Sequence, residues 1–160
     1  MSRSGPDLAL LLLRGFRVLV DAAIAELARR GYEDARPIHD FTMRAIAGGA
    51  DSASELGRQM SITKQSAARN VAVLQERGWV TSAPDPRDAR RKRLEVTPLG
   101  FEVMRVGESI FDELREQWAA RIGADELRRL EERLAELVGP VPVRFDTPGW
   151  ISRDLGDPAT

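Results

Sequence analysis

The 160-residue sequence has no cysteine and only one histidine, His39. Without cysteine, the chain forms neither a disulfide nor a thiol redox sensor. One histidine alone does not supply the ligands of the common zinc sites, so no metal and no cofactor are expected. The longest apolar run, residues 8–13, is too short to span a bilayer, and no signal-peptide cleavage site follows it. A cytoplasmic protein with no membrane partner is therefore expected.

Catalytic patterns are also lacking. The sequence contains no Gly-x-Ser-x-Gly, no His-Glu-x-x-His and no Cys-His pair. The Gly48-Gly49 pair lacks the lysine and the spacing of a phosphate-binding loop, and it is interpreted as a helix stop. An enzyme is therefore not expected.

The charge of the chain is unevenly distributed. Residues 58–93 hold nine cations against three acids, a net charge of +6, which leaves −7 for the rest of a chain whose total is −1. A basic segment on an acidic body suits a protein that presents one face to phosphate.

Residues 52–78 have the pattern of two helices joined by a short turn. Ser52 and Glu55 fit a capping box, in which serine caps the helix and glutamate reaches back to the cap amide. The second helix is expected over residues 63–77, and Gly78 follows it as a stop. Its apolar positions form one buried stripe of Ala67, Val71 and Leu74.

Residues 85–100 predict a turn, a cationic cluster, a strand and a helix start. Pro86 suits a tight turn, and Thr97-Pro98 combines an N-cap with proline at the first helical position. The returning strand is expected to start near Arg93, with Arg90 and Arg91 at the hairpin tip. A hairpin with an arginine-bearing tip directly after a helix-turn-helix is a wing that touches the DNA backbone or minor groove.

These segments resemble the MarR family of bacterial winged helix-turn-helix regulators. The matching residues are 54–60, 63–80, 85–90 and 96–100, and the resemblance is specific over about residues 38–105. It implies a mainly α fold with a small β-hairpin wing, flanked by N- and C-terminal dimerisation helices. It also implies a homodimeric transcriptional repressor.

The chain is interpreted as one regulator over residues 1–139. Its DNA-binding lobe is expected at about residues 38–100, its dimerisation helices at about 7–30 and 98–138, and an irregular extension without assigned role at 140–160. The first helix is apolar on more than one face, which predicts cover by a partner subunit. A coiled-coil-like pairing is indicated by Leu127, Leu130, Leu134 and Leu137.

The predicted DNA contacts lie on the second helix and the wing. Lys64, Gln65 and Ser66 form its first turn and Arg69 lies on about the same side, and these residue types bond to base edges and phosphates. Asp88 is expected either to orient a wing arginine by an ion pair or to be a solvated turn carboxylate. The full predicted set is Ser52, Thr63, Lys64, Gln65, Ser66, Arg69, Arg87, Asp88, Arg90 and Arg91.

A small-molecule effector is a further expectation, which rests on the resemblance. In that family, small and often phenolic ligands sit between the dimer arms and the DNA-binding lobe. His39 is interpreted either as an ordinary polar residue near a helix N-terminus or as part of such a pocket. The candidate pocket residues, each of which core packing would also explain, are Phe16, Arg17, His39, Phe41 and Met43.

Two functions follow from this pattern. The first is a regulator that binds a pseudo-palindromic operator in double-stranded DNA and is released by a small aromatic or phenolic ligand. The alternative is a winged-helix protein-interaction module that binds no DNA. The intact row of polar and basic residues from Lys64 to Arg69, together with the basic wing, favours the first.

Overall fold

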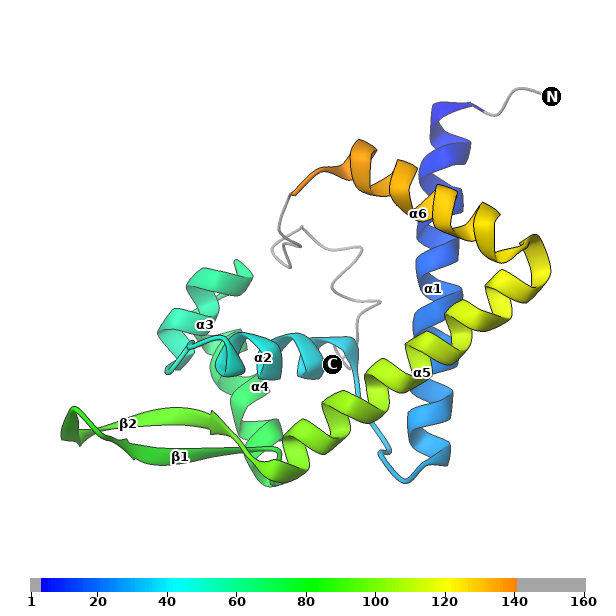
Figure 1. Cartoon of the computed structure of the whole chain (residues 1–160). Coiled ribbons are helices and arrows are strands. Elements are labelled where there is room, and N and C mark those ends of the chain that lie inside the picture. Colours follow the sequence, from blue (N-terminus) through cyan, green and yellow to red (C-terminus); the bar gives the residue numbers. More distant parts are fainter. Residues whose placement is uncertain (1–3, 141–160) are drawn as a thin grey trace, which may run out of the picture. The chain divides into compact units, whose positions relative to one another are not determined.

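The structure of the protein is a computed structural model that describes residues 4–140, without the side chains of Ala89 and Arg91. Its elements follow the order α1 (Gly5–Arg29), α2 (Pro37–Ala47), α3 (Ala53–Met60), α4 (Lys64–Glu76), β1 (Val80–Asp85), β2 (Asp88–Val96), α5 (Pro98–Ile122) and α6 (Ala124–Val138) (Figure 1). The described residues form two units: residues 4–35 and 106–140 make unit 1, and residues 36–105 make unit 2. The expected mainly helical fold with a two-stranded wing is confirmed.

In unit 1, α1 begins at a capping box that sequence reasoning did not identify. The hydroxyl of Ser4 accepts a hydrogen bond from the Asp7 N–H at 3.4 Å, and the Asp7 carboxylate accepts from the Ser4 N–H at 2.9 Å. The Ser4 hydroxyl also donates to the Asp7 carboxylate at 2.7 Å, and this bond, together with the one from the Ser4 N–H, lowers the pKa of Asp7. The helix therefore starts at Gly5, about two residues before the expected start near residue 7.

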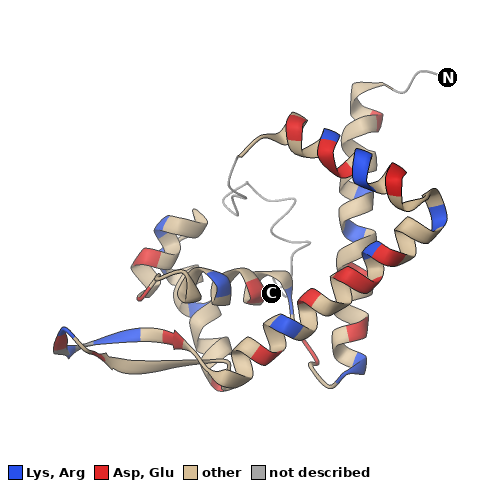
Figure 2. Ribbon diagram, in the orientation of Figure 1, with Lys and Arg blue, Asp and Glu red and all other residues tan. Residues whose placement is uncertain are grey.

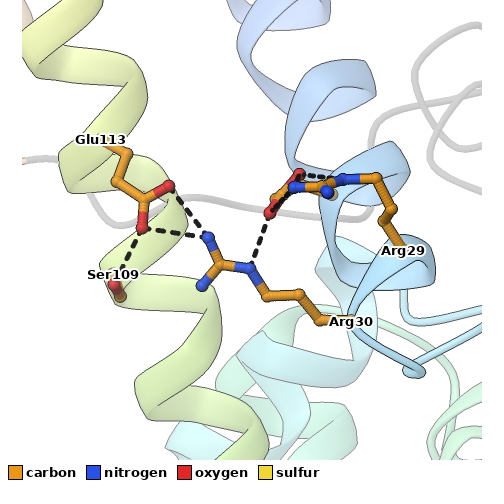
Figure 3. Close-up of polar contacts among 5 residues, drawn as sticks. Arg29, Arg30, Ser109 and Glu113 are labelled. Atoms are coloured by element: carbon orange, nitrogen blue, oxygen red, sulfur yellow. Dashed lines mark hydrogen bonds and ion pairs between the residues drawn. The ribbon is translucent and has the colours of Figure 1, made fainter.

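Arg30, just past the end of α1, bridges two carboxylates of unit 1. Its Nε donates to Glu26 at 2.7 Å, and its terminal nitrogen donates to Glu113 of α5 at 2.9 Å (Figure 3). The guanidinium groups of Arg29 and Arg30 lower the pKa of the Glu26 carboxyl. Because these side chains are exposed or half-buried, the bridge sets the position of α1 against α5 more than it stabilises the fold.

The last helix of unit 1 folds back after a glycine. Gly123 has a φ of 97°, a conformation that glycine adopts without strain, and it lets α6 begin directly after α5. Arg115 of α5 then forms two hydrogen bonds with Glu131 of α6, at 2.7 and 2.8 Å. Leu127 is buried in this unit, whereas Leu137 is 82% exposed.

In unit 2, α3 and α4 form the expected helix-turn-helix. Ser61 ends α3 in the left-handed conformation, at φ 53°. A Cβ added to Gly57 would lie 2.9 Å from the carbonyl oxygen of Ile62, so glycine allows the turn to approach α3 closely. The predicted stripe of α4 is confirmed, because its three apolar residues are all buried: Ala67, Val71 and Leu74.

The base of the wing is latched to the start of α5. Thr97 donates from its hydroxyl to the Gly78 carbonyl at 2.6 Å and from its N–H to the Trp79 carbonyl at 3.0 Å. The same hydroxyl accepts from the Gly100 N–H at 3.1 Å, which confirms Thr97 as the N-cap of α5. Gly78 has a φ of 71°, as expected of a helix stop. We call these four residues, Gly78, Trp79, Thr97 and Gly100, the α4–α5 latch.

Two local predictions were wrong. The second wing strand begins at Asp88, five residues before Arg93, because β2 carries an irregular segment that sequence alternation does not reveal. The box at α3 is only half formed: Ser52 caps the Glu55 N–H at 3.3 Å, but the Glu55 carboxylate bonds to Arg58 and Gln59 instead of the cap amide. The charged Arg58 side chain, about one helical turn away, forms a stronger hydrogen bond with the Glu55 carboxylate than the cap amide would.

Within residues 4–140, no helix is long and apolar enough to cross a membrane.

Gly100→Ala tests the latch. A Cβ at this position would lie 2.2 Å from the Trp79 carbonyl oxygen and 2.8 Å from Val96 Cγ1, so the backbone must shift. We expect a loss of roughly 1–3 kcal/mol in the free energy of unfolding, as for overpacked cores. Gly107→Ala is the matched control on α5, since a Cβ there meets nothing within 4 Å. Urea unfolding at one protein concentration compares them, and equal stability of the two variants would contradict the latch.

Candidate nucleic-acid interface

The N-terminus of α4 is organised by Thr63. Its hydroxyl accepts from the Ser66 N–H at 3.1 Å and donates to the Ser66 hydroxyl at 2.9 Å. Ser66 is half-buried, whereas Lys64, Gln65 and Arg69 are exposed. Of the residues predicted to read DNA, Thr63 and Ser66 thus bond to each other and build the start of the helix.

Two of the three exposed residues on α4 lie opposite its buried stripe. At 100° per residue, Gln65 and Arg69 fall on the side of the helix opposite Ala67, Val71 and Leu74, whereas Lys64 is the first helical residue and lies beside the stripe. Because the stripe packs into unit 2, the long polar side chains extend away from its core. Exposed lysine, glutamine and arginine side chains carry hydrogen-bond donors, and base edges and phosphates supply the acceptors.

The wing is an antiparallel hairpin with a bulge near its tip. Val80 pairs with Val96 at the base, and Pro84 pairs with Lys92. The next pair is Asp85 with Asp88, so residues 89–91 of β2 have no counterpart on β1. Bulges re-aim side chains and twist the strand, and this one includes both arginines that were predicted for the tip.

Two aspartates order the backbone of the tip. The Asp85 carboxylate accepts from the Arg87 N–H at 2.9 Å, and the Asp88 carboxylate accepts from the Arg90 N–H at 3.0 Å. Such side-chain bonds two residues along stabilise turns. Asp88 therefore acts on the backbone at Arg90, and its predicted ion pair with an arginine stays a prediction.

The wing cations are not equivalent. Arg87, Arg90 and Lys92 are exposed, and Figure 2 shows basic residues along β2 beside acidic ones at the tip. Arg93 instead donates from Nε to Glu95 on the same strand at 2.7 Å, which offsets its charge. The side chain of Arg91 lies outside the described part of the structure.

Contacts that sequence reasoning missed connect the wing to the rest of unit 2. Gln75 of α4 donates to the hydroxyl of Ser82 on β1 at 2.8 Å. The Leu94 N–H donates to the Asp51 carbonyl at 2.9 Å, which covers the outer edge of β2. No local signal reveals these pairs, because their partners come from different elements.

The buried Trp79 forms a second cluster in unit 2. The Arg77 guanidinium carbon lies 5.1 Å from the centre of the Trp79 ring, within cation–π range. His39 meets the same ring edge-on, with 6.1 Å between ring centres. Because Trp79 and His39 come from different elements, only the tertiary structure reveals this contact.

The predicted pocket residues differ in exposure. In unit 2, His39 and Met43 are buried, at 6% and 1% exposed, and Phe41 is half-buried. His39 Nδ1 accepts the Arg36 N–H at 3.3 Å, so the histidine helps to begin α2. In unit 1, Phe16 is 42% exposed and Arg17 lies 3.7 Å from Asp21.

No group of three or more potential metal ligands occurs among the described residues. Every buried side-chain nitrogen and oxygen in that part of the chain has a hydrogen-bond partner.

Comparison with known proteins agrees with this geometry. Residues 42–91, which cover α3, α4 and most of the wing, match the model of the MarR family. Wild-type MarR of E. coli has the same fold with a TM-score of 0.63 at 20% identity, over 82% of this chain and 97% of that one.

Two further solved structures share the fold. A mutant of S. aureus MepR bound to an oligodeoxyribonucleotide matches with a TM-score of 0.58 at 15% identity, over 81% of this chain and 94% of that one. CouR of Rhodococcus jostii RHA1 bound to p-coumaroyl-CoA matches with a TM-score of 0.61 at 20% identity, over 89% of this chain and all of that one. The helix-turn-helix and most of the wing, within residues 42–91, are thus those of the MarR family of winged helix-turn-helix DNA-binding transcriptional regulators, a family that is not enzymatic.

Proposed function

We propose that the protein is a homodimeric, cytoplasmic repressor that binds a pseudo-palindromic DNA site and is released by a small aromatic or phenolic ligand. The observation that carries this proposal is the exposed row of Lys64, Gln65 and Arg69, in the same compact unit as a basic wing. Base-reading donors and phosphate-binding cations are the two contact classes that a specific DNA complex needs.

In this mechanism, α4 enters the major groove and the wing binds the flanking backbone or minor groove. A dimer would place two copies of α4 in successive major grooves, about 34–36 Å apart. A ligand that changes the distance between the two DNA-binding units would lower affinity, because both half-sites would no longer fit at once.

The support for a dimer comes from unit 1. Its first helix leaves large apolar side chains uncovered along its N-terminal half: Leu8, Leu10, Leu11, Leu12, Phe16 and Val18. On α6, Leu130 and Leu137 are 44% and 82% exposed. Apolar faces of this extent mark protein–protein interfaces, and a second copy of unit 1 supplies a matching face.

The proposed ligand set is Phe16, Arg17, His39, Phe41 and Met43. CouR, which shares the fold, is described in complex with p-coumaroyl-CoA, an aromatic thioester. Exposed Phe16 and half-buried Phe41 offer aromatic surface directly, whereas Met43 would meet a ligand only if its surroundings opened.

Selection of bound sequences from a random DNA pool tests the function. We expect two inverted half-sites whose centres lie about 10–10.5 base pairs apart, the spacing of one helical turn. Titration of the selected site at several salt concentrations then measures affinity. A pool without enrichment, together with no salt-dependent retention on DNA, would favour the protein-interaction alternative.

Light scattering at micromolar concentration tests the dimer. We expect twice the mass of one 17.7 kDa chain, because exposed apolar area in unit 1 drives association. Leu11→Lys, which places a charge on that face, should shift the protein toward monomer, while Arg14→Lys on the same helix should not. A stable wild-type monomer would exclude the two-half-site mechanism.

The double variant Arg90→Ala, Arg91→Ala tests the wing. Each phosphate contact contributes about −0.9 to the slope of log affinity against log salt. Losing up to four cations from the dimer should therefore weaken binding and make that slope shallower. The unfolding temperature should not change, because Arg90 is exposed. Titrations of wild type and variant against one operator measure both effects.

Gln65→Ala is the contrasting variant for this experiment. Glutamine is uncharged, so its loss should leave the salt slope unchanged. If it contacts a base, affinity for the operator should fall by roughly 1–3 kcal/mol, with a smaller loss on random DNA. Unchanged slope and affinity in the arginine variant would mean that the wing cations contact only solvent.

A further inference from the structure

A hydrogen bond joins α4, the helix proposed to enter the major groove, to the wing at a point away from the hairpin base. Gln75 in the last turn of α4 donates from Nε2 to the Ser82 hydroxyl at 2.8 Å, and both residues are exposed. Ser82 pairs with Leu94, so the bond holds the hairpin at a point between its Val80–Val96 base and the bulge that begins beyond Pro84.

The wing needs such a support. The α4–α5 latch holds only its base, through Trp79 and Thr97, and two-stranded ribbons are marginally stable and variable in twist. On the other strand, Leu94 is held by the Asp51 carbonyl. Ser82 and Leu94, which face each other, are therefore each tied to a different part of unit 2.

We propose that Gln75 and Ser82 are positioning residues that set the wing at the orientation in which its cations and α4 contact DNA together. This inference rests on the proposed DNA-binding function. Neither side chain is buried, so the bond contributes little to the core, which is built separately by buried neighbours such as Leu74 and Val80. Its effect is on the geometry of an interface rather than on folding.

The charge of the two residues makes this role separable from direct DNA contact. Both are neutral, so neither releases a counterion from DNA by itself. If they position the wing, their loss weakens contacts made by cations, and the salt slope becomes shallower. If either residue instead bonds to DNA directly, affinity falls while the slope stays unchanged.

Ser82→Ala is the main test, measured by operator titration at several salt concentrations. We expect binding about threefold to tenfold weaker, the range for one net hydrogen bond, and a shallower slope. Ser82→Thr keeps the hydroxyl and should bind like wild type. Thr81→Ala is the matched control, since Thr81 is the exposed neighbour that pairs with Glu95 on the opposite face, and it should have no effect.

The same substitution in the Arg90→Ala, Arg91→Ala background completes the test. If Ser82 acts through the wing cations, Ser82→Ala should cost much less in that background. Gln75→Ala should repeat every result of Ser82→Ala, and unfolding temperatures should match wild type. A loss of the same size in both backgrounds, or no loss in either single variant, would overturn the proposal. Absence of operator binding by wild type would instead refute the proposed function itself.

Discussion

The close approach of Gly100 to the Trp79 carbonyl is the constraint on which unit 2 depends. No side chain fits between them, since a Cβ at Gly100 would lie 2.2 Å from that oxygen. The approach allows Thr97 to bond to both Gly78 and Trp79, so the end of α4, the base of the wing and the start of α5 share one set of hydrogen bonds. A recognition helix that is fixed in this way presents its exposed row as a rigid surface, which limits the entropy lost on binding DNA.

The chemistry of the proposed DNA-binding surface follows from the different roles of residues along α4. Thr63 and Ser66 form the hydrogen bonds at the start of α4, and the apolar stripe packs into the core. Lys64, Gln65 and Arg69 are exposed and take part in neither. Their substitution is therefore expected to change recognition without changing stability. The wing has the same separation, because its base is buried at Val80 while Arg90 is exposed beyond the bulge.

The net charge counted over residues 58–93 is larger than the positive charge that their surface presents to phosphate. Arg58 is paired with Glu55 and Arg93 with Glu95, so two of the nine cations between residues 58 and 93 are already compensated by neighbours. Glu55 has a lowered pKa because it accepts from Arg58 and then from Gln59, so this compensation persists at neutral pH. The cations with more freedom to meet phosphate lie at the start of α4 and near the tip of the wing, where an extended basic stretch alone would not have distinguished them.

The sequence by itself determined the elements that local chemistry specifies. The helix stop at Gly78, the caps at Ser52 and Thr97, and the buried stripe of α4 depend on neighbours within a few residues, so periodicity and turn chemistry predicted them. Tertiary structure decided what depends on partners distant in the chain: the burial of His39 beside Trp79, the bond between Gln75 and Ser82, and the bulge that moves the start of β2 to Asp88. The physical reason is that a hydrogen bond between elements, or an insertion in one strand, leaves no periodic signal in the sequence, because it depends on partners that only packing brings together.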